Sequence, residues 1–230
     1  MKTLFIEAKA NISLKPNRDV LKKIKELPKR IGIITTVQHV HKIKEFKQEL
    51  KKIGKEVYSA KGNLTKYESQ ILGCDINSAL KIKDKVDFYI YIGTGRFHPI
   101  EVLMKTQKPV FVYNPYSQSI KEISQSEIEE EYKKIRLATL KFLSSKKIGI
   151  LVSTKIGQKR LDFAFELKRK IEEKGKKAFV LLFETLDFSQ LENFNFVDCF
   201  INTACPRLID DYERFPKPVV NAEEILNYLK

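Results

Sequence analysis

Apolar and amphipathic stretches alternate along this chain, and they do so in two similar rounds. Residues 31–57 and 148–178 each open on a continuous apolar run, pass through a polar turn, and continue into a segment with apolar residues at helical spacing. Uninterrupted runs such as "RIGIITT" and "KIGILVS" are typical of parallel strands that are covered on both faces. The helical spacing selects Ile43, Phe46, Leu50 and Ile53 in the first round and Phe163, Leu167 and Ile171 in the second.

The two rounds continue to correspond further along the chain. "VDFYIYIGTG" at 86–95 aligns with "VDCFINTACP" at 197–206, and "KPVFVYNP" at 108–115 aligns with "KPVVNAEE" at 217–224. Each unit is therefore about 110 residues of alternating strand and helix, and this order predicts an α/β fold with two repeated parallel-sheet units.

The chain opens with a piece that matches the end of such a unit. "KTLFIEA" at 2–8 resembles "KPVFVYN", and a helix is predicted after it, with Asn17 as its cap and Pro28 as its stop. The residues predicted to face inward are Val20, Leu21, Ile24 and Leu27. We expect this strand and helix to be the last part of a unit whose earlier part is missing. The expected domains are a remnant at 1–28, a middle domain at 29–120, a connecting helix at 121–146 and a C-terminal domain at 147–230.

The connecting helix has its own start signal. Ser126 and Glu129 have the spacing of a capping box, in which a hydroxyl and a carboxylate satisfy the first backbone N–H groups of a helix. The predicted apolar stripe of this helix is Ile128, Tyr132, Ile135 and Phe142.

The charge of the chain leaves two interpretations open. The 230 residues include 43 Lys and Arg against 29 Asp and Glu, a net charge of +14. This excess is compatible with RNA or an acidic protein partner. It is also compatible with solvated helix faces, because most of the basic residues lie between apolar positions of expected helices. No aromatic RNP-like motif adds to the case for RNA.

Hydropathy and cysteine content indicate where the protein works. No apolar run reaches the roughly 18 residues of a membrane span, and the apolar run within residues 1–6 is too short for a signal peptide. Three cysteines without a CxxC pair argue against a disulfide framework or a closed zinc site. We therefore expect a cytoplasmic protein with reduced thiols and no membrane contact.

Binding sites of open parallel sheets lie beyond the carboxyl ends of the strands, and four stretches are expected there. In "TTVQHVH", Gln38 or His39 could face a site. His39 and His41 lack the i,i+4 spacing of a helical metal pair, and a role as polar cap residues explains them as well. In "SQILGCD", Gly73 permits a close turn before Cys74, although a lone cysteine is usually a small core residue.

The third stretch, "YIGTGRFHP", is a glycine turn between a strand and a helix. Gly93 and Gly95 directly after the strand form a turn that suits an anion, but the third glycine of the dinucleotide fingerprint is missing. Arg96 and His98 could recognise a carboxylate. The alternative is a tight turn with Arg96 in solvent.

The fourth stretch, "ACPR", occupies the same place in its unit as the glycine turn does in the previous one. Pro206 removes a backbone donor and ends the strand, which leaves Cys205 at its tip. Cys199 lies six residues earlier, and six extended residues span about 20 Å, too far for both sulphurs to share one small cluster. Cys199 is therefore interpreted as part of the core.

Together these motifs resemble a known family. "SQILGCD", "GTGRFHP", "GQKRL" at 157–161 and "INTACPRLIDDY" are similar to 2-(3-amino-3-carboxypropyl)histidine synthase, the iron–sulphur enzyme of diphthamide biosynthesis. "TTVQHVH" also fits the archaeal members. The resemblance runs over essentially the whole chain, and the motifs occur in the family's order.

The resemblance implies a fold, a reaction and a set of site residues. The family has three similar α/β domains, each giving one cysteine to a [4Fe–4S] cluster that binds S-adenosylmethionine. In this non-classical radical chemistry the aminocarboxypropyl group is cleaved from sulphur and added to C2 of a histidine imidazole in translation elongation factor 2. The implied cluster ligands are Cys74 and Cys205, and the implied S-adenosylmethionine contacts are Gln38, Gly93, Gly95, His98, Gln158 and Arg160. No catalytic side chain beyond the cluster ligands is implied.

The chain also departs from the family pattern. The first domain and its cysteine are missing, and Ser69 stands where the family has glycine before Gln70. Since two cysteines hold a cubane cluster poorly, we expect a separate chain to supply the first domain and the third cysteine, within a homo- or hetero-oligomer. The alternatives are a non-catalytic supporting subunit, because eukaryotic members are heterodimers with two unequal clusters, and a basic α/β module that binds nucleotide or RNA.

Overall fold

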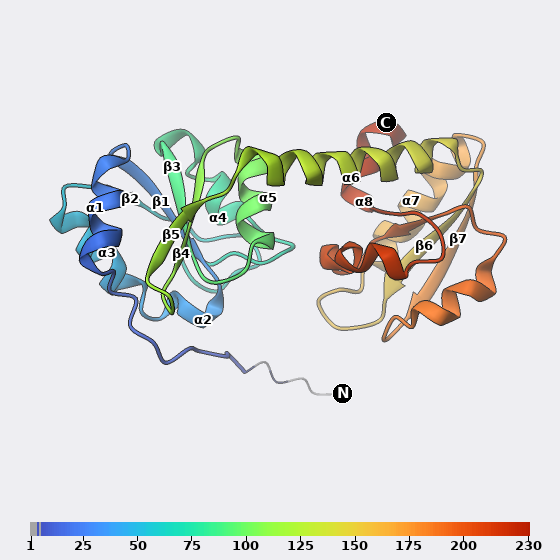
Figure 1. Cartoon of the computed structure of the whole chain (residues 1–230). Coiled ribbons are helices and arrows are strands. Elements are labelled where there is room, and N and C mark those ends of the chain that lie inside the picture. Colours follow the sequence, from blue (N-terminus) through green and yellow to red (C-terminus); the bar gives the residue numbers. More distant parts are fainter. Residues whose placement is uncertain (1–3, 5) are drawn as a thin grey trace. The chain divides into compact units, whose positions relative to one another are not determined.

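The computed structural model describes Leu4 and residues 6–230, which form two compact units. The first unit ends at Ile128, and the second comprises Glu129–Lys230. Each unit has its own sheet and its own apolar core (Figure 1). The alternation of helices with parallel strands confirms the expected α/β class.

The first unit is built on a five-stranded sheet in the order β2-β1-β3-β4-β5, in which β5 pairs antiparallel and the other pairs are parallel. Its strands are β1 Arg30–Thr35, β2 Glu56–Tyr58, β3 Phe88–Ile92, β4 Val110–Asn114 and β5 Ser119–Glu122. Its helices are α1 Arg18–Glu26, α2 Val37–Val40, α3 Ile43–Lys52, α4 Asn77–Leu80, the 3-10 turn η1 Lys83–Lys85 and α5 Phe97–Thr106.

Helices cover both faces of this first sheet. Ile31 and Ile33 pack with α1 and α3, whereas Ile34 packs on the other face with α4 and α5. Figure 1 shows the two pairs of helices on opposite sides of the strands. All five residues of β3 are buried, as expected of a central strand in a sheet covered on both faces. This arrangement explains the uninterrupted apolar runs of the sequence.

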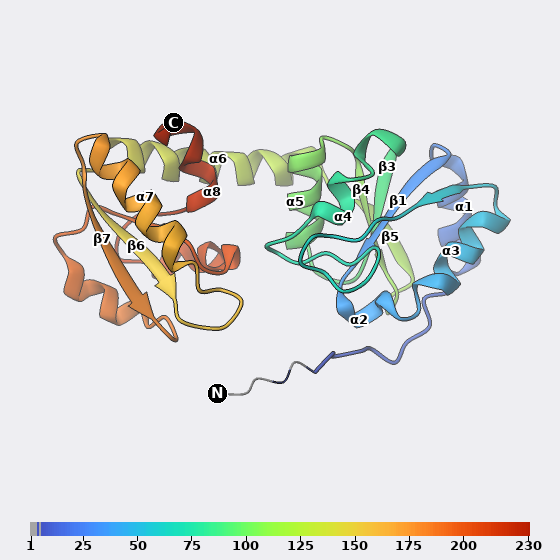
Figure 2. The same cartoon turned by 180° about the vertical axis from the view of Figure 1, so that it is seen from behind.

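The second unit repeats the plan with a four-stranded parallel sheet in the order β7-β6-β8-β9. Figure 2 shows α7 lying along β6 and β7. The strands are β6 Lys147–Ser153, β7 Lys177–Phe183, β8 Cys199–Asn202 and β9 Val219–Asn221. The helices are α6 Gln125–Ser144, α7 Leu161–Glu173, α8 Ala222–Ile225 and the 3-10 segments η2 Phe188–Phe194, η3 Pro206–Arg214 and η4 Leu226–Leu229.

The internal repeat holds at the level of single residues. A Cβ added at Gly32 of β1 would lie 2.5 Å from the Tyr89 ring, and one added at Gly149 of β6 would lie 2.8 Å from the Phe200 ring. The glycine and the aromatic residue are register partners in both sheets. In each unit, therefore, a glycine on the first strand makes room for a large ring on the third.

In both units, a lysine follows the glycine at the end of a helix, and the two lysines make equivalent hydrogen bonds. Lys55 Nζ donates to three main-chain carbonyls at the end of α1, those of Lys25, Leu27 and Pro28. Lys176 Nζ donates to three carbonyls at the end of α6, those of Phe142, Leu143 and Ser145. The unpaired carbonyls of a helix end are thus satisfied in the same way twice. α1 consequently has the place in the first unit that the end of α6 has in the second.

The helix expected after residue 17 is confirmed. The Asn17 side chain accepts a hydrogen bond of 2.8 Å from Val20 N–H, and Val20 and Ile24 are buried in the core of the first unit. The strand expected at 2–8 lies in part outside the described residues. The described ones, Leu4 and 6–8, are not in a strand, so that part of the prediction is wrong.

Two expectations for the connecting helix are also corrected. The capping box of α6 is formed by Ser124 and Glu127, not by Ser126 and Glu129: Ser124 N–H donates to Glu127 Oε2 at 2.9 Å, and Glu127 N–H donates to Ser124 Oγ at 3.4 Å. Of the expected stripe, Ile128 and Phe142 are buried, but Tyr132 is 45% exposed.

The close fit between Gly32 and Tyr89 generates a prediction about stability. In Gly32→Ala the new methyl group has no room against the buried ring, and overpacking of this kind costs about 1–3 kcal/mol. We expect the free energy of unfolding to fall by about 2 kcal/mol in urea denaturation. Gly95→Ala is the control, because a Cβ there meets open space. Equal losses at the two positions would contradict the explanation.

Candidate functional site

Cys74 lies at the tip of a tight turn in the first unit. Leu72 and Asp75 exchange two backbone hydrogen bonds of 3.0 and 3.1 Å, so Gly73 and Cys74 protrude between them, and Cys74 is exposed. A Cβ added to Gly73 would come within 2.8 Å of the Phe97 ring at the start of α5. The close turn expected at Gly73 is therefore present, and it packs against the segment that follows the glycine turn 93–95.

The buried carboxylate of Asp75 braces this turn. Its oxygens accept hydrogen bonds from Leu64 N–H, Asn77 N–H and the Asn77 side-chain amide at 2.5, 3.0 and 2.8 Å. Burial acts to raise the pKa of Asp75, but these hydrogen bonds outweigh it and hold the pKa below its usual range. A buried carboxylate that accepts several N–H bonds fixes the backbone around it.

The glycine turn lies at the carboxyl end of β3, as expected. Gly93 N–H donates to the Tyr113 carbonyl at 3.0 Å, and a Cβ at Gly93 would collide with the Tyr91 ring. Gly95 is exposed, and His98 stacks on the Tyr91 ring with centroids 6.0 Å apart. Arg96 forms an ion pair with Glu127 at the start of α6, so it does not simply extend into solvent.

The stretch containing Gln38 is covered in part by the N-terminal segment. The Gln38 side chain is exposed, while its carbonyl accepts a hydrogen bond of 2.9 Å from Ala10 N–H. His39 is buried with its Nδ1 unpartnered, and burial together with the nearby His41 lowers its pKa. Of the two residues weighed at this position, only Gln38 presents its side chain to solvent.

One carboxylate ties the N-terminal segment to the loop before Cys74. Glu7 accepts hydrogen bonds from Lys66 Nζ at 2.9 Å and from Tyr67 Oη at 2.8 Å, and Lys9 lies 3.2 Å away. These contacts, that of Lys66 foremost, lower the pKa of Glu7 to about 2. The segment that precedes α1 is thus attached to the first unit.

Cys205 lies in the turn between β8 and η3 of the second unit. It is half-buried and serves as the N-cap residue of η3, with Pro206 in the first turn, as the sequence predicts. Cys199 is completely buried in the core, and burial raises its pKa to about 12. The interpretation of Cys199 as a packing residue is confirmed.

The stretch with Gln158 and Arg160 forms the turn that leads into α7. Gln158 is half-buried, and Arg160 is the N-cap residue of the helix. The Arg160 guanidinium pairs with Glu223 at 2.5 Å and lies 4.2 Å above the centre of the Phe163 ring. Glu223 lies at the start of α8, directly after β9. The ion pair therefore joins the segment that follows β6 to the segment that follows β9.

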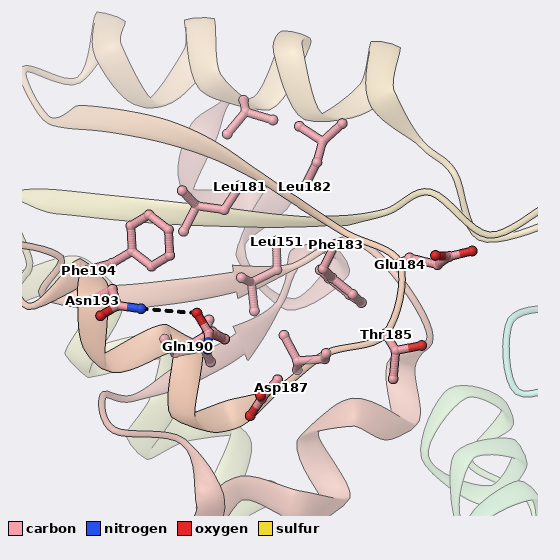
Figure 3. A pocket seen from close by; sticks show the side chains of 13 residues that line it. Leu151, Leu181, Leu182, Phe183, Glu184, Thr185, Asp187, Gln190, Asn193 and Phe194 are labelled. Carbon is pink, nitrogen blue, oxygen red and sulfur yellow. Dashed lines mark hydrogen bonds between the residues drawn. The ribbon is translucent and has the colours of Figure 1, made fainter.

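A cavity of about 660 Å³ lies in the second unit beside β7 (Figure 3). Its walls are mostly apolar, with Glu184, Asp187 and Gln190 among the polar residues that line it. None of the site residues expected from the sequence lines this cavity. The described residues also contain no group of three or more His, Cys, Asp or Glu side chains that could hold a metal ion. Each unit taken alone therefore offers one accessible thiol and no complete metal site.

Comparison with known proteins identifies the class. Two α/β units with mainly parallel sheets, each with one accessible cysteine in a turn, define a repeat protein that presents single thiols. The sequence profile described as "Putative diphthamide synthesis protein" matches residues 1–230. The chain therefore belongs to the diphthamide synthesis protein family.

Two archaeal proteins are among the relatives of this chain. It is 32% identical over 227 residues to 2-(3-amino-3-carboxypropyl)histidine synthase from Pyrococcus horikoshii, covering 97% of this chain and 64% of that protein. It is 33% identical to the protein of the same name from Methanocaldococcus jannaschii, covering 100% of this chain and 63% of that protein. The crystal structure of Dph2 from Pyrococcus horikoshii with a 4Fe–4S cluster superposes with a TM-score of 0.84 at 30% identity, over 96% of this chain and 63% of that one.

The chain thus spans less than two thirds of the length of these relatives. Among the described residues, no helix is long and apolar enough to cross a membrane.

Some residues that shape the site could not be identified from the sequence. Asn202 and Asn221 form a buried hydrogen-bonded pair below Cys205 although they are 19 positions apart. Nothing local in the sequence links them. A weaker signal existed for Asn202, because an asparagine just before a turn commonly bonds the backbone two residues on.

Ser69 gives rise to a prediction. Its φ is +63°, a region that disfavours any residue with a Cβ, and its buried hydroxyl has no hydrogen-bond partner. Its backbone is held there by bonds from Ser69 N–H to Ala60 O and from Thr35 N–H to Ser69 O, both 2.8 Å. We expect Ser69→Gly to raise the free energy of unfolding by about 1 kcal/mol, because such backbone strain costs about 1–3 kcal/mol.

Ser69→Ala is the matched control, since it removes the hydroxyl but keeps the Cβ. Chemical denaturation should rank the free energies of unfolding as glycine above alanine above serine. A glycine variant less stable than the alanine variant would disprove the assignment of strain.

Proposed function

We propose that this chain is part of the enzyme that transfers the 3-amino-3-carboxypropyl group of S-adenosylmethionine to a histidine of translation elongation factor 2. The observation that carries the proposal is the state of the three thiols. Cys74 and Cys205 are accessible and lie in turns, one in each unit, while Cys199 is buried in the core. Similarity to a protein crystallised with a 4Fe–4S cluster supports the same role for the two accessible thiols.

Cys74 and Cys205 are the proposed cluster ligands of this chain. Thiolates are the soft ligands that iron–sulphur clusters use, and both cysteines are accessible enough to be metallated. Two cysteines leave a cubane cluster with irons that lack a protein ligand. We therefore include in the proposal a third cysteine that lies outside these 230 residues, on a separate chain.

The remaining candidates would hold the co-substrate. A reduced cluster held by Cys74 and Cys205 would supply the electron needed to cleave the bond between the sulphonium and the aminocarboxypropyl carbon. The carboxylate and the ammonium of that group need oriented partners. The backbone of the turn at Gly93 and Gly95 suits an anion, Arg160 supplies a positive charge, and the side chains of Gln38, His98 and Gln158 are polar partners.

The first prediction of this proposal concerns the ligands. We expect Cys74→Ser and Cys205→Ser each to lower the iron bound after anaerobic reconstitution, and to change the electron paramagnetic resonance signal of the reduced cluster, because hydroxyls are poor ligands for it. Cys199→Ala is the control and should bind as much iron as the wild type. Iron content unchanged in both serine variants would refute the assignment.

The same measurement tests the need for a partner. The chain should be reconstituted alone and after co-expression with a chain that supplies the third cysteine, and turnover on elongation factor 2 should be followed in both. A full cluster and normal turnover in the chain alone would overturn the proposal that a separate chain is needed. A full cluster without turnover in the complex would instead favour a supporting subunit.

A second prediction concerns Arg160. A hydrogen bond to a charged group contributes about 1.5–3 kcal/mol, so Arg160→Ala should weaken S-adenosylmethionine binding about tenfold or more in the assembled complex. Arg169→Ala is the matched control, because Arg169 lies on the same helix and pairs only with Glu173, one turn away. Isothermal titration of the reconstituted complex measures both. Equal affinity in the wild type and Arg160→Ala would remove Arg160 from the site.

A further inference from the structure

The backbone of the turn that carries Cys205 is fixed by hydrogen bonds at successive residues. Thr203 donates twice to the Leu151 carbonyl, from its N–H at 3.1 Å and from its hydroxyl at 2.8 Å. Ala204 N–H donates to Asn202 Oδ1 at 3.0 Å. The strand end is thus anchored to β6 and to a side chain of β8 before the chain reaches the cysteine.

Two asparagine amides hold the second half of the turn. Asn202 Nδ2 donates to the Cys205 carbonyl at 2.8 Å and to Asn221 Oδ1 at 2.7 Å. Asn221 Nδ2 donates to the Pro206 carbonyl at 3.2 Å. The side-chain amide of Asn202 therefore spans the turn from Ala204 to Cys205, and Asn221 extends the hold by one residue.

Burial makes this arrangement specific. Asn202 is 1% exposed and Asn221 is 9% exposed, so neither amide can replace its partners with water at little cost. Both residues end neighbouring parallel strands, β8 and β9, where they are register partners. Their common position is set by the sheet, and the turn takes its conformation from them.

We propose that Asn202 and Asn221 are positioning residues for the Cys205 thiol: the two amides hold the turn so that Sγ is presented at one place before any metal arrives. The role of that thiol as a ligand rests on the proposed function, but the fixing of the turn is a property of this chain alone. Preorganised ligands bind a metal group better, because the cost of ordering them has already been met in folding.

The first unit reaches the same result by other means. There the buried Asp75 carboxylate braces the Cys74 turn by accepting backbone N–H groups, whereas in the second unit the amides also donate to backbone carbonyls. Two unlike polar groups thus hold the only two accessible thiols among the described residues.

The test uses the three native thiols of the metal-free 230-residue chain. Alkylation by iodoacetamide is followed at each cysteine by peptide mass spectrometry, in the wild type, Asn221→Ala and Asn202→Asp. Asn202→Asp keeps the acceptor for Ala204 N–H but loses the donor to the Cys205 carbonyl. We expect the rate at Cys205 to rise about fivefold or more in each variant, because each loses two hydrogen bonds and the loss of one bond of about 1 kcal/mol already gives about fivefold.

The other two cysteines serve as internal references. Cys199 lies in the core of the same unit and reacts only when that unit opens, and Cys74 reports on the first unit. A rise confined to Cys205 supports positioning. A rise of the same size at Cys199 would mean general destabilisation and would overturn it, as would an unchanged rate at Cys205. Recording the rate from pH 7 to 10 separates access, read at the plateau, from a change in the thiol pKa.

Asn193→Ala is the matched control for these variants. Asn193 lies in η2 of the same unit, and its side-chain amide donates to the Gln190 side chain at 3.1 Å (Figure 3). The cysteine alkylation rates of the Asn193→Ala variant should equal those of the wild type. If Asn202→Asp fails to fold, Asn221→Ala alone decides the outcome, since Asn221 touches the turn only through the Pro206 carbonyl and Asn202.

A second arm separates this inference from the proposed function. In the reconstituted complex, Asn221→Ala should bind less iron than the wild type and broaden the electron paramagnetic resonance signal, while Asn193→Ala should match the wild type. A wild type that binds no cluster would refute the proposed function while the alkylation result still stands. A variant with a normal cluster and a normal alkylation rate would refute the positioning role.

Discussion

Both sheets of this chain are covered on their two faces by apolar side chains, and this constraint decides where polar chemistry can occur. In β3 every residue is buried, and in β6 only the first is exposed. A charged or reactive group on such a strand would lose its hydration. Cys199 illustrates the point, since its burial in β8 keeps it a neutral thiol. Polar and reactive groups therefore gather where the strands end.

The two units use the same scaffold to hold different groups. Each has a glycine that makes room for a neighbouring aromatic ring, and each has a lysine that satisfies the end of the helix before the first strand. After the third strand, however, the first unit has a glycine turn and carries its cysteine on a separate turn at 72–75, whereas the second carries its cysteine directly. The shared contacts lie in the cores, and the differences lie in the turns, as expected of sites placed on a common fold.

Much of the fold could be predicted because its signals are local. Uninterrupted apolar runs predict the parallel strands. Asn17 predicts the start of a helix, because its side chain can accept a hydrogen bond from the N–H group of Val20, three residues later. The capping box of α6 shows where local signals fail. "SQSEIEE" contains two overlapping boxes, and the one used includes Glu127, which also pairs with Arg96. The box that forms is the one whose glutamate also contacts Arg96, 31 positions away in sequence. Neither residue spacing nor helix propensity could predict that contact.

The same limit applies to the candidate site. Motifs identify Cys74 and Cys205, but not the groups that hold them, because Asn202 meets Asn221 only once β8 and β9 lie side by side.

Arginine residues at strand ends show a related effect, with a consequence for ligand binding. Arg96 and Arg160 both follow strands in sequence, and both already have a glutamate partner. An anionic ligand that binds Arg160 at Nη1 displaces Glu223 from that nitrogen, so its gain there is the difference between two carboxylate contacts rather than the whole of one. Because the Arg160–Glu223 pair is more than a third exposed, solvent screens it and the replacement costs little. Glu223 thus holds the Arg160 guanidinium in place at the start of α7. A ligand carboxylate that makes further contacts can still bind this guanidinium.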